Sequence, residues 1–105
     1  MQQFDVYENP SPGAHATVPY LIVLQHDRTS ETHSVIVAPL VPKAKVERMT
    51  TSPLYPVLSI ASKEHALLTT GLAAVPRAAL KTRVSNQEAD RGHIINALDL
   101  LFTGV

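Results

Sequence analysis

The sequence contains no cysteine and no tryptophan, and only 5% of its residues are aromatic. Without cysteine, the chain can form no disulfide bond, no zinc–thiolate site and no cysteine nucleophile. Basic residues interleaved with aromatic ones, which nucleic-acid proteins use to stack bases, are missing as well. The sequence therefore gives no support to a disulfide-stabilised scaffold or to a base-stacking surface.

Charge is also scarce. Charged residues make up 17% of the chain, below the usual quarter, and nine basic residues balance nine acidic ones. A net charge of zero gives no general attraction to nucleic acid or to an anionic membrane. It also removes the electrostatic repulsion between copies of the chain. The low charge density indicates that a partner covers some apolar surface.

Long apolar runs are absent from the sequence. No stretch approaches the 18 apolar residues of a membrane-spanning helix. The first ten residues, MQQFDVYENP, lack the basic start and apolar run of a signal peptide. We therefore expect a cytoplasmic protein without a membrane association. The length of 105 residues predicts a single domain.

The first half of the chain is typical of β-structure. Residues 2–7 alternate, with Phe4 and Val6 on one face, and predict a short strand. Residues 18–26 predict a second strand, whose 21–24 segment is apolar on both faces and therefore covered on both sides. Residues 33–40 predict a third strand that ends at Pro39 and forms an antiparallel hairpin with the second.

The middle of the chain is less regular. Residues 41–52 predict one helical turn, and Pro53 and Pro56 indicate that the strand at 53–60 lies at a sheet edge. Residues 62–65 predict a turn. The apolar stretch 66–76, with Gly71 at its centre, predicts a bulged strand.

The clearest pattern is helical and covers residues 86–102. Ser85 and Glu88 have the spacing of a capping box, and Gly104 lies where a left-handed helix end commonly needs glycine. The apolar residues of this helix span too wide an arc for one contact surface. We expect one side to cover the sheet and the other to meet a partner such as a second copy.

No catalytic or metal-binding pattern is present in the sequence. The five histidines form no metal-binding pair, the carboxylates are scattered, and neither a nucleophile elbow nor a phosphate loop is found. Asp99 interrupts the apolar end of the helix, either as an exposed position or as a polar contact on a binding face. The sequence therefore predicts a protein that binds rather than catalyses, with no cofactor or metal.

Five segments together resemble the CcdB family, the toxins of plasmid-type toxin–antitoxin pairs. In chain order they read QFDVY, VIVAPL, LYPVLSI, LLTTGLAAVP and IINALDLLFTGV. The resemblance implies a mostly β fold with a C-terminal α-helix, a small antiparallel sheet-barrel shared with MazF-like toxins, assembled as a homodimer. It also implies that the whole chain, residues 1–105, is one toxin domain.

The resemblance further implies a function. Toxins of this family bind the A subunit of DNA gyrase and trap the enzyme on cleaved DNA. A CcdA-like antitoxin neutralises them, and the pair represses its own operon, so DNA is reached only through the antitoxin or gyrase.

Particular residues follow from the resemblance. Its implied gyrase-binding positions are Arg28, Thr29, Asp99, Phe102, Thr103, Gly104 and Val105. Its implied dimer-interface positions are Leu98, Leu101, Phe102 and Gly104. The best-known members carry tryptophan where this chain has Thr103, asparagine where it has Asp99, and two isoleucines where it has Arg28 and Thr29.

Two alternatives stay open at this point. One is a MazF-like ribonuclease on the same scaffold, for which Arg28, Thr29 and Arg77 are conceivable groups. The other is a non-toxic homologue that acts only in antitoxin binding and operon repression, because the aromatic residue at the tip is replaced.

Overall fold

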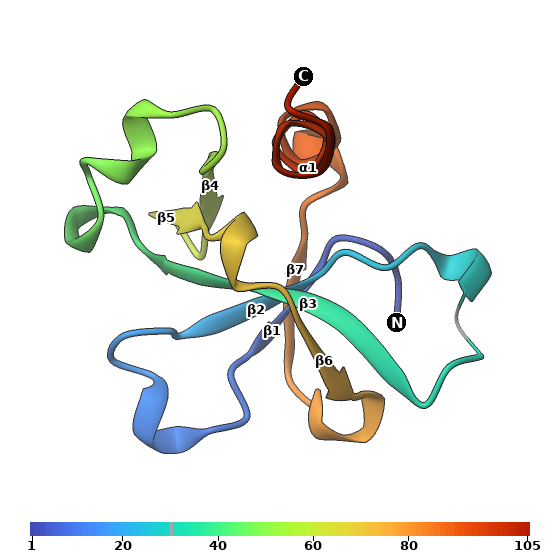
Figure 1. Ribbon diagram of the computed structural model, residues 1–105. Coiled ribbons are helices and arrows are strands. Elements are labelled where there is room, and N and C mark those ends of the chain that lie inside the picture. The colour runs from blue at the N-terminus through green and yellow to red at the C-terminus, as the bar shows by residue number, and fades with distance from the viewer. Residues whose placement is uncertain (30) are drawn as a thin grey trace.

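The computed structural model describes residues 1–29 and 31–105 and shows one curled antiparallel sheet with a single α-helix at its C-terminal end (Figure 1). The predicted fold class, mostly β with a C-terminal helix, is confirmed. The strands within the described residues are β1 (Asp5–Glu8), β2 (Tyr20–Val23), β3 (Ser34–Pro42), β4 (Val57–Ile60), β5 (Lys63–Leu67), β6 (Ala73–Pro76) and β7 (Arg83–Asn86).

The α-helix, α1, spans Arg91–Thr103. Short 3-10 turns connect the strands: η1 (Pro12–Ala14), η2 (Asp27–Thr29), η3 (Lys43–Lys45), η4 (Met49–Thr51), η5 (Thr69–Gly71), η6 (Arg77–Ala79) and η7 (Glu88–Asp90). The one helical turn expected at 41–52 is thus two 3-10 turns, η3 and η4. No helix in the described residues has the length and apolar character needed to cross a membrane.

The strands follow the order β4-β5-β3-β2-β1-β7, and β6 also pairs with β3. The expected hairpin is present, because β2 and β3 pair antiparallel from Tyr20 opposite Leu40 to Val23 opposite Val37. The expected end of the third strand at Pro39 is wrong. Pro39 pairs with Leu21, its carbonyl accepts a hydrogen bond from the Leu68 N–H, and β3 continues to Pro42.

The stretch 66–76 is not one bulged strand. It divides into β5, η5 and β6, and the two strands pair with different parts of β3. Gly71 lies at this break, where an added Cβ would come within 2.9 Å of the Pro39 ring. The absence of a side chain therefore serves a close approach between two segments.

The prediction of a turn at 62–65 is largely wrong. Lys63 begins β5, which pairs antiparallel with β4, and the connection is made by Ala61 and Ser62. Both have positive φ angles, 51° and 66°, as a tight hairpin turn requires. The expectation of an edge strand at 53–60 is confirmed, because β4 ends the strand order.

Both faces of the sheet are buried, as the apolar 21–24 segment predicts. Ile22 belongs to a cluster under α1, whereas its neighbour Val23 belongs to a second cluster on the opposite face. The first cluster contains Phe4, Val6, Ile22, Leu24, Ala38, Leu40, Leu58, Ile60, Leu67 and Ile94. The second contains Tyr7, Val23, Val35, Val37 and Leu80. The predicted alternation of β1 is confirmed, because Val6 and Tyr7 fall in different clusters.

The start of the helix differs from the prediction. Ser85 is part of β7, where it lies opposite Val6, and its hydroxyl donates to Gln87 Oε1 rather than capping the helix. Pairing with β1 keeps the backbone of this segment extended, so the capping box does not form. Residues 88–90 make a 3-10 turn, and α1 begins only at Arg91.

Candidate functional site

Helix α1 changes character along its length. Ile94 and Ala97 are fully buried, and Ile95 and Leu98 pack partly against the cluster beneath the helix. Beyond them the helix leaves the core: Phe102 is 69% exposed. The first half of the helix therefore anchors it, and the second half presents apolar side chains at the surface.

A groove of about 390 Å³ lies between the end of α1 and the turn η2. Its lining residues come from four parts of the chain: Leu24, Gln25, Thr29, Ile36, Leu72, Leu98 and Phe102. Three of these, Thr29, Leu98 and Phe102, are expected site residues. The fold brings Thr29 next to Leu98 and Phe102, which lie about 70 residues further along the chain. Ile36, on β3, adds a further exposed apolar side chain. An apolar surface of this kind is typical of a site for another protein.

The other expected residues of the helix end are all at or near the surface. Asp99 is exposed, and its carbonyl accepts a 2.7 Å hydrogen bond from the Thr103 hydroxyl. Gly104 has a φ of 76° and donates its N–H to the Leu100 carbonyl, so the predicted left-handed helix end is confirmed. Val105 is 88% exposed.

Leu101 behaves differently from its neighbour Phe102. It is half-buried and does not line the groove. The expected dimer-interface residues Leu98, Leu101, Phe102 and Gly104 thus range from half-buried to exposed. None is enclosed in the core, so each retains surface for a contact with a second chain.

The turn η2 is held mainly by Gln25. The Gln25 amide nitrogen donates to the Thr29 carbonyl, and its Oε1 accepts from the Ile36 N–H. Arg28 is not part of this arrangement: it is exposed, it does not line the groove, and its backbone N–H donates to His26 Nδ1. Of the two expected positions on this turn, the fold places only Thr29 in the groove.

Arg77 also supports the turn. Its guanidinium donates to the carbonyls of Thr32 and Thr29 and to the Thr32 hydroxyl. A ribonuclease would need this guanidinium free to meet a phosphate. The structure uses it instead to bind Thr29 and Thr32.

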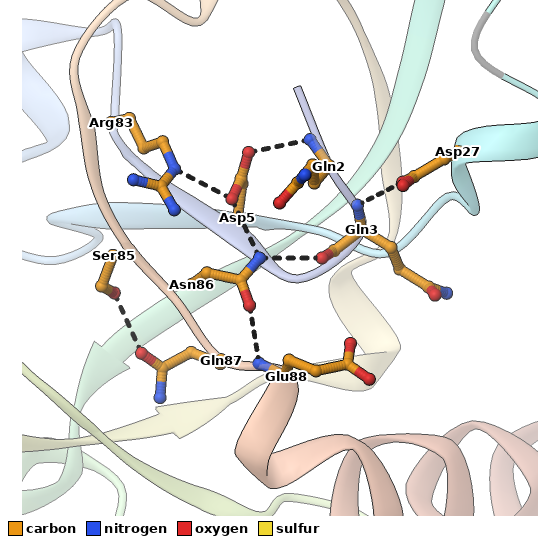
Figure 2. A network of polar contacts seen from close by, with 9 residues as sticks. All are labelled: Gln2, Gln3, Asp5, Asp27, Arg83, Ser85, Asn86, Gln87 and Glu88. Atoms are coloured by element: carbon orange, nitrogen blue, oxygen red, sulfur yellow. Dashed lines mark hydrogen bonds and ion pairs between the residues drawn. The ribbon is translucent and has the colours of Figure 1, made fainter.

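The opposite end of α1 is surrounded by a polar network that the sequence patterns do not reveal (Figure 2). At its centre is Asp5, whose side chain is 3% exposed. Its carboxylate accepts from Arg83 Nε and Asn86 Nδ2, both at 2.9 Å, and from the Gln2 N–H at 2.8 Å. Asn86 Oδ1 in turn accepts from the Glu88 N–H at the start of η7.

The electrostatics of Asp5 and Tyr7 follow from this arrangement. Burial by itself raises the pKa of Asp5, but hydrogen bonds from Asn86, Gln2 and Arg83, with the charge of Arg83, outweigh it and lower that pKa. Burial and the nearby Asp5 charge raise the pKa of Tyr7. The only signal for Asp5 in the sequence is an acidic residue placed between Phe4 and Val6 in a strand.

Within the described residues, no group of three or more histidine, aspartate or glutamate side chains is placed to hold a metal ion. In the same part of the chain, every buried side-chain nitrogen and oxygen has a hydrogen-bond partner. The arrangement at the end of α1 therefore offers apolar contact and shape, with exposed polar atoms at its margin.

Comparison with known proteins agrees with this description. No curated protein matches the sequence. A family model described as CcdB protein matches residues 3–104, nearly the entire chain. The chain therefore belongs to the CcdB family of toxins from toxin–antitoxin modules.

Proposed function

We propose that this toxin binds the A subunit of DNA gyrase and traps gyrase on cleaved DNA, acting by binding and not as an enzyme. Membership of the CcdB family supports a toxin of this type. The observation that carries the proposal is the exposed Phe102 at the end of α1, beside an apolar groove that also contains Thr29. Aromatic side chains in such positions are the usual anchors of protein interfaces.

The proposed mechanism is selective binding to one state of gyrase. After gyrase has cut DNA and its A subunits have separated, the toxin occupies the space between them and disfavours religation. A binder changes the population of a state only by its difference in affinity for the two states. The toxin needs no cofactor for this, because the chemistry of DNA cleavage belongs to gyrase.

The active form in this proposal is a homodimer. Leu98, Leu101, Phe102 and Gly104 would lie near a two-fold axis, so that two copies of the tip act together. A two-fold interface uses the same patch on both chains, and a patch at the end of α1 brings both ends to one place. The half-buried Leu98 and Leu101 and the exposed Phe102 provide apolar surface for this contact.

The remaining partner is a CcdA-like antitoxin. In the proposal the antitoxin binds the toxin dimer in the cytoplasm, blocks its contact with gyrase, and supplies the DNA-binding part of the complex that represses the operon. The zero net charge of the toxin agrees with this division, since it gives the toxin no general affinity for DNA.

A gyrase cleavage assay tests the proposal. Purified protein is incubated with gyrase, ATP and supercoiled plasmid, and the reaction is quenched with detergent and protease. We expect linear DNA above the level without toxin. We also expect Phe102→Ala to lower it at least tenfold, because the loss of an interface anchor costs about 2 kcal/mol or more.

Tyr55→Ala is the matched control, because Tyr55 is a half-buried aromatic residue outside the groove. Thr103→Trp, which introduces an aromatic side chain at the tip, is expected to increase the linear product. Absence of linear DNA with several gyrases, the host enzyme included, would contradict the proposal. RNA cleavage by the purified protein would then identify a ribonuclease, and absence of growth arrest on expression a non-toxic homologue.

A further inference from the structure

We propose that Gln3 is a positioning residue, which fixes the turn η2 relative to helix α1 so that the two form one binding surface. This inference rests on the proposed function, because it concerns the groove between these elements. Gln3 lies outside the groove and is not among its lining residues. Its effect on binding is therefore indirect.

The hydrogen bonds of Gln3 divide between the two elements. Towards the turn, its N–H donates to Asp27 Oδ1 at 2.7 Å (Figure 2). Its Nε2 donates to the Leu24 carbonyl at 3.0 Å. On the other side, its carbonyl accepts from Asn86 Nδ2, at the end of β7, at 3.1 Å, and its Oε1 accepts from Arg91 Nη1, at the start of α1, at 3.2 Å. The four polar groups of this residue thus connect the segment Leu24–Asp27 with β7 and the start of α1, and its side chain alone links Leu24 to Arg91.

The neighbouring Phe4 locks this connection in place. The Phe4 N–H donates to the Val23 carbonyl at 2.6 Å, and its carbonyl accepts from the Gln87 N–H at 3.0 Å. The Arg91 guanidinium lies 5.6 Å from the centre of the buried Phe4 ring, in a cation–π contact. Phe4 also has a φ of 70°, which a residue with a side chain adopts only when its surroundings impose it. This left-handed kink sets the position from which Gln3 reaches both elements.

The connection matters because the groove has walls from both elements. Thr29 belongs to the turn, whereas Leu98 and Phe102 belong to the helix. A partner that contacts both walls binds best when their separation is fixed before binding, because ordering a loose element weakens the complex. Gln25 and Arg77 hold the turn in shape, but their hydrogen bonds do not reach α1. Gln3 reaches α1 through its hydrogen bond from Arg91.

The first measurement is a distance. The chain has no cysteine, so spin labels can be placed at two introduced cysteines, Glu31→Cys beside the turn and Asn96→Cys on α1, both at exposed positions. Labelled chain is diluted with unlabelled chain, so that only distances within one copy are recorded. We expect a narrow distribution for the parent and a clearly broader one when Gln3→Ala is added.

The second measurement is binding of the gyrase A subunit, at a temperature well below the unfolding transition. Gln3→Ala is expected to weaken binding roughly tenfold, about 1.4 kcal/mol. Asn9→Ala is the matched control, because the Asn9 amide also donates to a distant carbonyl, that of Val18, at the other end of the sheet. The control should leave both the distance distribution and binding unchanged.

Each result decides a separate question. An unchanged distance distribution in Gln3→Ala would overturn the positioning role, and so would a broadened distribution with unchanged gyrase binding. If the parent protein binds no gyrase, the proposed function fails, while the distance measurement still tests the connection. If Gln3→Ala does not fold, Gln3→Glu is used. It keeps the acceptor for Arg91 but loses the donor to Leu24, so the same broadening is expected, and its absence would overturn the inference.

Discussion

The two ends of helix α1 are built in opposite ways. At its start, Asp5, Asn86 and Gln87 form a polar network in which buried groups are all partnered. At its end, Phe102 and Val105 are exposed and apolar. The start is therefore costly to alter and determines where the helix lies. The end contributes little to folding and is free to bind, so stability and recognition are placed at opposite ends of one element.

The largest effect should come from the buried first half of the helix. We expect Ile94→Ala to lower the free energy of unfolding by about 4 kcal/mol, because Ile94 is fully buried and truncation leaves a cavity. Phe102→Ala should change it by less than about 0.5 kcal/mol, because that side chain is exposed. Urea unfolding of both variants measures the contrast. Equal losses would remove the distinction between the two ends.

The next effect concerns the polar network. Asp5→Ala removes the acceptor of three hydrogen bonds, so Arg83 loses its ion-pair partner and Asn86 Nδ2 keeps only its bond to the Gln3 carbonyl. We expect a loss of about 3 kcal/mol. Asp99→Ala, at the opposite end, changes an exposed carboxylate and should stay within about 0.5 kcal/mol. Thermal unfolding of the two variants provides the comparison, and a loss below about 1 kcal/mol for Asp5→Ala would mean that the network is not structurally important.

A smaller effect is expected in acid. The pKa of Asp5 is lower in the folded chain than the value of about 3.9 in an unfolded one. The unfolded chain therefore binds more protons between these two values, and the stability due to Asp5 is present above about pH 4 and lost as the pH falls through the folded pKa. We expect a loss of stability between pH 5 and pH 3 that is smaller in Asp5→Asn, which has no carboxylate to protonate at this position. Urea unfolding across this range, with Asp99→Asn as control, measures it, and identical curves for parent and Asp5→Asn would refute the assignment.

The smallest effect concerns the helix end itself. Gly104 has a positive φ, so Gly104→Ala introduces backbone strain of about 1 kcal/mol, although a Cβ there would meet no other atom within 4 Å. Because the end is exposed, we expect fraying of the last turn to relieve part of this strain. Amide hydrogen exchange of residues 100–104 should show it, with protection of the Ile94 amide unchanged. Loss of protection along the whole helix would show that its two ends are coupled.

Local patterns in the sequence were sufficient for the general fold and for the tip. Three features could be interpreted from residues close together in the sequence. They are the 21–24 segment that is apolar on both faces, the two prolines before β4, and the glycine after the helix. The resemblance to the CcdB family predicted Thr29 and Phe102 as gyrase-binding residues and Leu98 as a dimer-interface residue, and all three line one groove.

The errors have a common origin in distant contacts. Ser85 and Glu88 have the spacing of a capping box, but β1 holds Ser85 in a strand. Lys63 is polar and turn-like, but β4 pairs with it. Gln3 and Asp5 give no local signal, because their partners Arg91 and Arg83 lie at the other end of the chain. Patterns of neighbouring residues cannot reveal such pairs.

The pairing of β1 with β7 also has a consequence for the order of folding. Asp5 lies opposite Asn86, so the first strand finds one of its two neighbours only after nearly all of the chain is available. Closing so large a loop is entropically unfavourable, and folds rich in such contacts acquire their native structure slowly. The β2–β3 hairpin can form early, whereas β1 can pair with β7 only once both strands have been synthesised. During synthesis, the helix that presents the tip can therefore be fixed in place only after β7 has been made and has paired with β1.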